Sequence, residues 1–403
     1  MLKLVRILCS GVGAAGATFL LQVLLSHKLP MHQFGIYAAA NSSLAMIGPF
    51  AGMGVGGLFL RKACVDENRY NEYFSVALKC VFINIIIAII VSQFIFFNTG
   101  LDIIQALCLA SFYLPIAFQY FVISYAQVSE NFAKVSIAQI INPLLRVVTI
   151  LFLFLLSPTL TNTTILLFFA NLGSFVILLK LIDQNKIFQL LFFKQSKSVF
   201  FSFFKESFLY SFNGTINVVQ IQLSIIMAMY LFGSNTSGIY SSAIVLLTAC
   251  YILPNLIFGT YLLPQYHKLE KAALKITSLQ HSIVAFVLGI FFFIVVYASS
   301  EIVIKLLYPA TFKNSAQLLN ILAISLPFRF YSTGIGAALL NEKCIKRKVS
   351  ASFLGLIFQV FLMLSLRNIG EESLSISFVL SEVLTAVIYT IIFFKYFNNK
   401  AIN

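Results

Sequence analysis

The chain has 403 residues and a formal net charge of +14, yet only 10% of its residues are charged and 60% are hydrophobic. A soluble domain carries about 25% charged residues, and the mean hydropathy of +0.95 lies far from that class. This composition excludes a set of soluble domains. It also argues against nucleic acid as the partner of the basic charge, because the lysines and arginines lie in short segments between apolar runs. We therefore predict an integral membrane protein.

Apolar runs of 18 residues or more predict an all-α protein with about twelve transmembrane helices. The runs stay apolar for about twenty residues, whereas the strands of a membrane barrel alternate over about ten. The predicted spans are 7–26, 35–60, 74–97, 103–125, 136–156, 162–182, 207–232, 238–263, 281–299, 316–340, 349–366 and 374–394.

The distribution of lysine and arginine predicts the orientation of these spans. Most of the 27 basic residues fall in segments on the side that holds the N-terminus. Because positive charge is enriched in cytoplasmic loops, we expect both termini to lie in the cytoplasm. The predicted outer segments hold only Lys28, Lys305, Lys313 and Arg367.

Matching sequence landmarks indicate an internal repeat. GIYAA at residues 35–39 opens the second span and GIYSS at 238–242 opens the eighth, while KVS opens the fifth span at 134–136 and the eleventh at 348–350. Offsets of a little over 200 residues favour two six-helix lobes, although apolar segments also resemble one another by chance. Transporters commonly bind substrate between such repeats. The predicted domains are an N-terminal lobe at 1–182, a basic cytoplasmic linker at 183–206 and a C-terminal lobe at 207–403.

Two arginines, Arg146 and Arg329, lie deep in apolar spans, one in each predicted half. A guanidinium at the centre of a bilayer costs about 2.5–3.5 kcal/mol on insertion scales, so such residues face a protein interior or a watered cavity. Both are candidates to bind a phosphate or carboxylate. The alternative is pairing with structural groups. Glu382, in the last span, is the candidate charge partner, and it is equally a candidate ion-coupling site.

Further candidate substrate-binding residues are weaker. Lys79 lies near the predicted cytoplasmic end of the third span, where its side chain can equally extend to the lipid headgroups. Asn213, Asn217 and Gln220 recur at helical spacing in the seventh span. They suit hydrogen bonds to the hydroxyls of a polar ligand, or hydrogen bonds between helices.

No pattern indicates a cofactor or a metal. The glycines of residues 52–57 match G-x-G-x-x-G, but they lie inside an apolar span rather than between a strand and a helix. Close helix packing explains them better. The histidines and cysteines lack the spacing of a metal site.

Three stretches carry a resemblance to a known family. They are LPMHQFGIY at residues 29–37 with the glycines and LRK that follow, residues 127–146, and residues 306–330 from LLYP to SLPFRF. With the two-lobe layout, the chain resembles the Wzx-type O-antigen and polysaccharide-repeat flippases of the MATE-like exporter superfamily. The resemblance implies translocation of an undecaprenyl-diphosphate-linked oligosaccharide between the leaflets of a bacterial inner membrane by alternating access. It also implies lipid partners, a polymerase and chain-length regulator of the same pathway, no cofactor, and coupling to a Na⁺ or H⁺ gradient.

Two other functions remain open at this stage. A cation-coupled drug or metabolite exporter of the same superfamily prefers carboxylates in its cavity, and Glu382 is the only one well inside the spans. A membrane oligosaccharide polymerase or glycosyltransferase needs a large outer loop with catalytic residues. The longest predicted outer segment, residues 299–315, is short and carries only Glu301, Lys305 and Lys313 as charged groups.

Overall fold

A computed structural model describes residues 2–97, 99–183, 197–266, 268–340 and 344–398. The elements assigned in this part of the chain are all helical, and none is a strand. Within these described residues, eleven helices are long and apolar enough to cross a membrane, or twelve when a helix pair bent by 43° counts as one span. The prediction of an all-α protein with about twelve spans is therefore confirmed.

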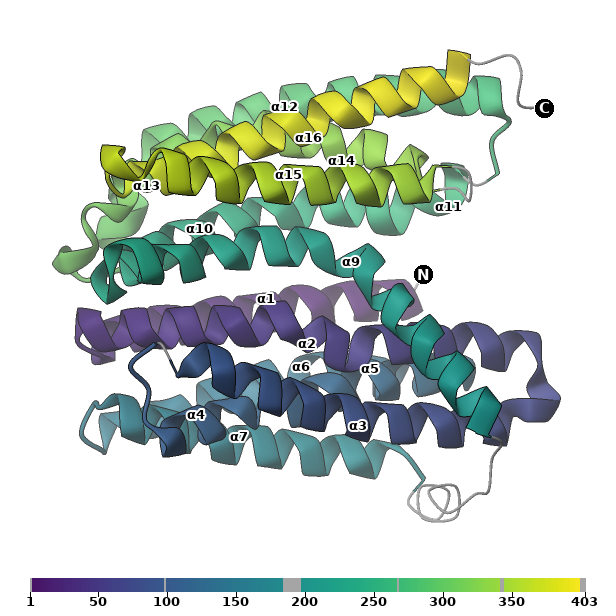
Figure 1. Ribbon diagram of the computed structural model, residues 1–403, viewed down its shortest axis with the longest axis horizontal. Coiled ribbons are helices and arrows are strands. Elements are labelled where there is room, and N and C mark those ends of the chain that lie inside the picture. The colour runs from purple at the N-terminus through teal and green to yellow at the C-terminus, as the bar shows by residue number, and fades with distance from the viewer. Residues whose placement is uncertain (1, 98, 184–196, 267, 341–343, 399–403) are drawn as a thin grey trace. The chain divides into compact units, whose positions relative to one another are not determined.

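The contacts divide the chain into two compact units, Met1–Ile226 and Met227–Asn403, and the division falls inside one helix, α9. Within each unit the long helices lie side by side (Figure 1). Residues 184–196 of the linker predicted at 183–206 lie outside the described residues, and residues 197–206 form the start of α9. The predicted boundary stays a prediction. Unit 1 contains α1 (Leu2–Lys28), α2 (Met31–Val65), η1 (Glu67–Arg69), α3 (Tyr70–Phe96), α4 (Ile103–Ala110), α5 (Tyr113–Val128), α6 (Phe132–Leu151), η2 (Phe152–Phe154), α7 (Leu160–Leu181) and most of α9 (Lys197–Phe232).

Unit 2 continues from the end of α9 with helices of similar length. The longest, α12, has 37 residues, which is more than an apolar core of about 30 Å requires. Its elements are α10 (Ser234–Pro254), the π-helical η3 (Asn255–Leu262), α11 (Leu263–Tyr266), α12 (Lys271–Leu307), η4 (Ala310–Phe312), α13 (Ser315–Ala323), α14 (Ser325–Ala338), α15 (Ile345–Ser365), η5 (Arg367–Ile369) and α16 (Glu372–Asn398).

One predicted span of each unit is broken just before a Leu-Pro dipeptide. In unit 1 the break separates α4 from α5, whose third residue is Pro115. In unit 2 it separates α13 from α14, whose third residue is Pro327. Proline has no backbone N–H to donate to the carbonyl four residues earlier, so the helix is interrupted at that point. A single predicted run of apolar residues is consequently built from two helices in both places.

The glycines of the second predicted span permit a close approach of two helices. A Cβ atom on Gly52 in α2 would lie 2.5 Å from the Cα of Ala117 in α5, closer than two carbon atoms can stand. Small residues let helix backbones approach in this way inside a membrane. The packing explanation for these glycines therefore has a direct structural basis.

A lysine at the start of one helix holds the end of a neighbouring helix in each unit. Lys134, in the first turn of α6, donates from Nζ to the Leu181 carbonyl at the end of α7, at 2.7 Å. Lys348, in the first turn of α15, donates to the Gly336 carbonyl in the last turn of α14, at 2.9 Å. Carbonyls at a helix C-terminus lack helical partners, and a cation there is favourable. These lysines open the two KVS landmarks, but the helix held follows α6 in unit 1 and precedes α15 in unit 2. The internal repeat stays a prediction.

Candidate functional site

The candidate site in unit 1 is centred on Arg146, in the middle of α6. Its Nη2 donates to the Tyr37 hydroxyl at 3.2 Å and to Asn41 Oδ1 at 3.1 Å, and its guanidinium lies 5.1 Å from the centre of the Phe112 ring. Tyr37 and Asn41 are one helical turn apart on α2, so their side chains reach the same point. Only 7% of Arg146 is exposed.

Every partner of this guanidinium is neutral. The ion pairs of the described residues include Lys62–Glu206, Arg69–Glu72 and Arg329–Glu382, and none is found for Arg146 within this part of the chain. Its Nε is buried and has no acceptor. A buried cation without a countercharge is unfavourable, and it retains N–H groups with which to bind an anion. The geometry is therefore suited to binding an anion.

Polar groups continue from Arg146 along the same face of α6. Asn142, one turn earlier, is buried, and its Oδ1 accepts from the Ser174 hydroxyl of α7 at 3.5 Å. Nearby on α7, Asn171 donates to the Ser111 hydroxyl at 2.9 Å while its own Oδ1 has no partner. Such neutral donors and acceptors suit hydroxyl groups rather than charge.

The candidate site in unit 2 differs, because its arginine is compensated. Arg329 of α14 donates from Nη1 to Glu382 Oε1 of α16 at 3.2 Å, with 8% and 1% of the two residues exposed. The guanidinium also lies 5.1 Å from the Tyr251 ring centre. A buried pair of this kind is held by mutual attraction against the cost of desolvation. Of the two arginines, Arg329 is thus paired with Glu382, whereas Arg146 has no carboxylate partner among the described residues.

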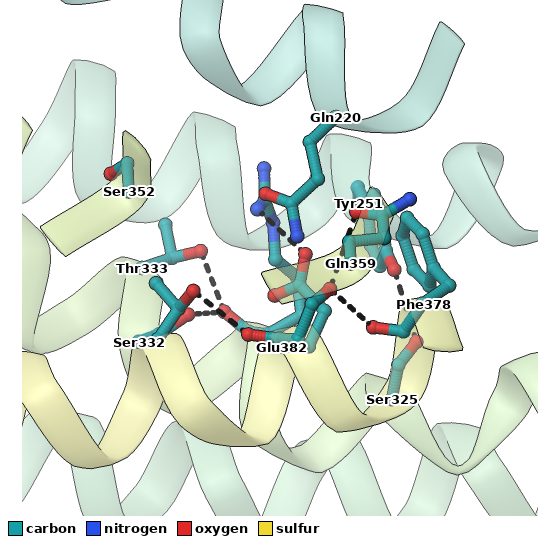
Figure 2. A network of polar contacts seen from close by, with 12 residues as sticks. Gln220, Tyr251, Ser325, Ser332, Thr333, Ser352, Gln359, Phe378 and Glu382 are labelled. Carbon is teal, nitrogen blue, oxygen red and sulfur yellow. Dashed lines mark hydrogen bonds and ion pairs between the residues drawn. The ribbon is translucent and has the colours of Figure 1, made fainter. Parts of the chain in front are cut away.

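Hydroxyl and amide groups surround this ion pair (Figure 2). The hydroxyls of Ser332 and Thr333 donate to the Arg329 carbonyl at 3.1 and 2.7 Å. Tyr251 and Ser325 share a hydrogen bond of 3.1 Å. These bonds fix the backbone of α14 around Arg329, so the guanidinium lies in a rigid polar cluster.

The weaker sequence candidates are scattered. Lys79, on α3, is half-buried, and on α9 Asn217 is exposed whereas Gln220 is 1% exposed. The side chain of Asn213 lies outside the described residues. The structure brings none of these four into the contacts described for Arg146. Their substrate-binding role stays a prediction.

The sequence predicts Glu382 as a charge partner for either arginine, and the structure pairs it with Arg329. The sequence does not predict the neutral partners, because Tyr37 stands out only in the repeated GIY motif and Phe112 and Tyr251 carry no local signal. These partners lie at least 34 residues from their arginines in the sequence, at 109 residues for Tyr37. The available signal is chemical: aromatic and amide side chains on other spans are the groups that a buried arginine can contact inside a membrane.

The fold and the buried cations define a polytopic membrane protein with the fold of the MATE and MurJ transporters. The chain is similar to an inward-facing multidrug resistance MATE family transporter of the MOP superfamily, at 12% identity, with 95% of this chain and 94% of that chain covered and a TM-score of 0.77. It is also similar to the lipid II flippase MurJ in an inward closed conformation, at 12% identity, with 97% and 87% covered and a TM-score of 0.72. An outward-facing MATE transporter gives 12% identity, coverage of 98% and 95%, and a TM-score of 0.61.

The family itself is given by the sequence. The profile of the family described as "Polysaccharide biosynthesis protein" matches residues 3–270, about two thirds of the chain, and the chain belongs to this family. The predicted resemblance to the Wzx-type flippases is confirmed at this level. A search of curated protein sequences found no match.

Proposed function

We propose that the protein is a flippase that moves an undecaprenyl-diphosphate-linked oligosaccharide from the cytoplasmic to the periplasmic leaflet of a bacterial inner membrane. The observation that carries the proposal is Arg146, a buried guanidinium with only neutral partners. A diphosphate offers the oxygen acceptors that its N–H groups lack. Family membership and a MATE- and MurJ-like fold support a lipid-linked cargo.

The same residues suggest which part of the cargo each protein group binds. Arg146 holds the anionic diphosphate, and the amides and hydroxyls of Asn41, Asn142 and Ser174 face the sugar hydroxyls. Arg329 contacts the anion only when its ion pair with Glu382 is broken. The release of Glu382 from that pair makes it the candidate group for coupling to a Na⁺ or H⁺ gradient during alternating access. A polymerase and a chain-length regulator of the same pathway are the proposed partners.

A drug or metabolite exporter is the alternative, and one observation separates the two. Cationic cargo requires carboxylates in the cavity, but among the described residues Glu382 is the only buried carboxylate, and it is paired with Arg329. The unit-1 site offers a positive charge instead. An anionic cargo fits this chain better.

The function is tested in a bacterial strain that lacks its own flippase. We expect this chain to restore surface polysaccharide for at least one defined sugar repeat, and purified protein in liposomes to move the matching lipid-linked oligosaccharide between leaflets. The control is efflux of a cationic dye from the same liposomes. Dye efflux without movement of any lipid-linked sugar would establish the exporter alternative, and elongation of the sugar chain by the purified protein would establish a polymerase.

The proposed direction of transport depends on the predicted orientation, which labelling can test. In a background without cysteine, we expect Ser198→Cys, exposed at the start of α9, to react with an impermeant maleimide only after the cells are opened. Asn368→Cys, exposed in η5, should react in intact cells. Labelling of Ser198→Cys in intact cells would contradict an orientation with both termini in the cytoplasm.

A further inference from the structure

Unit 2 has a cavity of about 730 Å³ at the end of α12 and the start of α13. The last turns of α12 lie beyond the apolar run predicted at 281–299, in the longest predicted outer segment. Small-molecule sites have volumes of about 300–1,000 Å³ and combine apolar walls with a small number of polar groups. Six of the eleven residues that line this cavity carry a charged or amide side chain, so it is suited to a polar ligand. The charged and amide lining residues are Glu301, Lys305, Lys313, Asn314, Gln317 and Asn320.

Two polar groups of lining residues are buried without a partner. Tyr308 is 3% exposed and its hydroxyl makes no hydrogen bond, and Asn320 Oδ1 likewise has no donor. Burial raises the pKa of the Tyr308 hydroxyl, which therefore stays protonated and can donate. Asn320 Oδ1 can only accept. A ligand that satisfies both must offer an acceptor and a donor, which a sugar hydroxyl combines and a fully ionised phosphate does not.

The wall of the cavity is held in place by its neighbours. The rings of Tyr308 and Phe312 pack with their centres 5.6 Å apart. Gln317 donates from Nε2 to Glu372 Oε1 of α16 at 2.5 Å. These contacts fix the shape of the cavity before a ligand arrives, which lowers the entropic cost of binding.

The charges at the cavity favour an anion. Lys305 and Lys313 are exposed and Glu301 is the only carboxylate in the lining, so the cavity carries a net charge of one positive unit. Two flexible ammonium groups can approach one carboxylate, while the amides serve the uncharged hydroxyls. The combined chemistry is that of a saccharide with a carboxylate on one of its rings.

We propose that this cavity binds an acidic saccharide on the outer face of the membrane. The inference rests on the proposed function and deepens it, because it names a glycan chemistry for the cargo and gives that glycan a holding site after translocation. The site is separate from Arg146 and from the Arg329–Glu382 pair, none of which lines the cavity. A uronic acid in the repeat unit then contributes to the selection of cargo.

The test measures binding of soluble sugars to the full-length protein in nanodiscs by calorimetry. The probes are cellobiouronic acid, which carries one glucuronate, its neutral counterpart cellobiose, and inorganic phosphate. We expect the acidic disaccharide to bind about tenfold more tightly than cellobiose. The double variant Lys305→Ala/Lys313→Ala should lose that preference, and Glu301→Gln should raise affinity for the acidic sugar about threefold. Asn320→Ala should weaken both sugars.

The control is Arg367→Ala, which removes an exposed cation of the same unit on the same predicted face. It should leave all three affinities unchanged. Equal affinity for both sugars, no sugar binding, or phosphate bound as tightly as the acidic sugar would each overturn the proposal. Because the variants at Lys305, Lys313 and Asn320 alter this cavity alone, lipid-linked cargo can still be moved when the cavity proposal fails. Conversely, sugar binding without any movement of lipid-linked cargo points to failure of the proposed function.

Discussion

Arg146→Met is expected to abolish export of surface polysaccharide while leaving the protein as stable as the wild type. Loss of hydrogen bonds to a charged group costs about 1.5–3 kcal/mol, which is roughly a 10- to 100-fold loss of affinity for an anionic cargo. Methionine fills a similar space without the desolvation cost of an unpaired cation. In the variant the Tyr37 hydroxyl can donate to Asn41 Oδ1 instead. The two groups lie close together, because in the wild type both accept from Nη2 of Arg146.

The measurement combines complementation, protein level in the membrane and apparent melting temperature. Arg347→Met, which removes an exposed arginine at the start of α15, is the matched control and should support normal export. A residue kept for structure would behave differently. An Arg146→Met protein that melts several degrees lower, or that exports normally, would show that the guanidinium has a structural role instead.

The Arg329–Glu382 pair is expected to show the opposite behaviour. Glu382→Leu leaves a buried guanidinium without its carboxylate and should lower the free energy of unfolding by about 3–5 kcal/mol, and Arg329→Met should be destabilising for the reciprocal reason. The double variant Arg329→Met/Glu382→Leu should recover most of that loss. The interaction energy of the double-mutant cycle should then be a large fraction of the stability loss of either single variant.

The exposed pair Arg69–Glu72, at 2.8 Å, provides the control. An ion pair that water can screen contributes about 0–1 kcal/mol, so Arg69→Met should change stability little. Unfolding is followed in nanodiscs for each single and double variant. If the double variant loses as much free energy of unfolding as the two single variants together, the interaction energy is zero. Arg329 and Glu382 are then held by other groups.

Much of the fold could be predicted because membrane spans leave a strong local signal. About twenty consecutive apolar residues identify a helix wherever they occur, and the structure has helices at all the predicted runs. The breaks before Pro115 and Pro327 were less visible, because each lies inside a continuous apolar run. Hydropathy measures length and polarity, and it is insensitive to a missing backbone N–H.

The candidate site was only partly predictable. Arg146 and Arg329 stood out because charge in an apolar run is costly, but the sequence treated them alike. The difference lies in which helices face each other: α16 presents Glu382 to Arg329, whereas α2 presents Tyr37 and Asn41 to Arg146. Pairing between helices is a tertiary property that no local pattern encodes. The cavity beside Tyr308 was missed for the same reason, since its charges are few and dispersed in sequence.

The uncompensated guanidinium of Arg146 has an energetic consequence for the proposed cycle. A diphosphate carries about two negative charges, so Arg146 makes the loaded site carry about one negative charge and the empty site one positive charge. A membrane potential that is negative inside acts on each charge with about 2.3 kcal/mol per 100 mV. It drives the loaded site outward and the empty site inward. Both halves of the proposed cycle therefore run downhill in voltage. The charge of the cargo sets the total electrical work, and the fixed charge of Arg146 divides that work equally between the two halves.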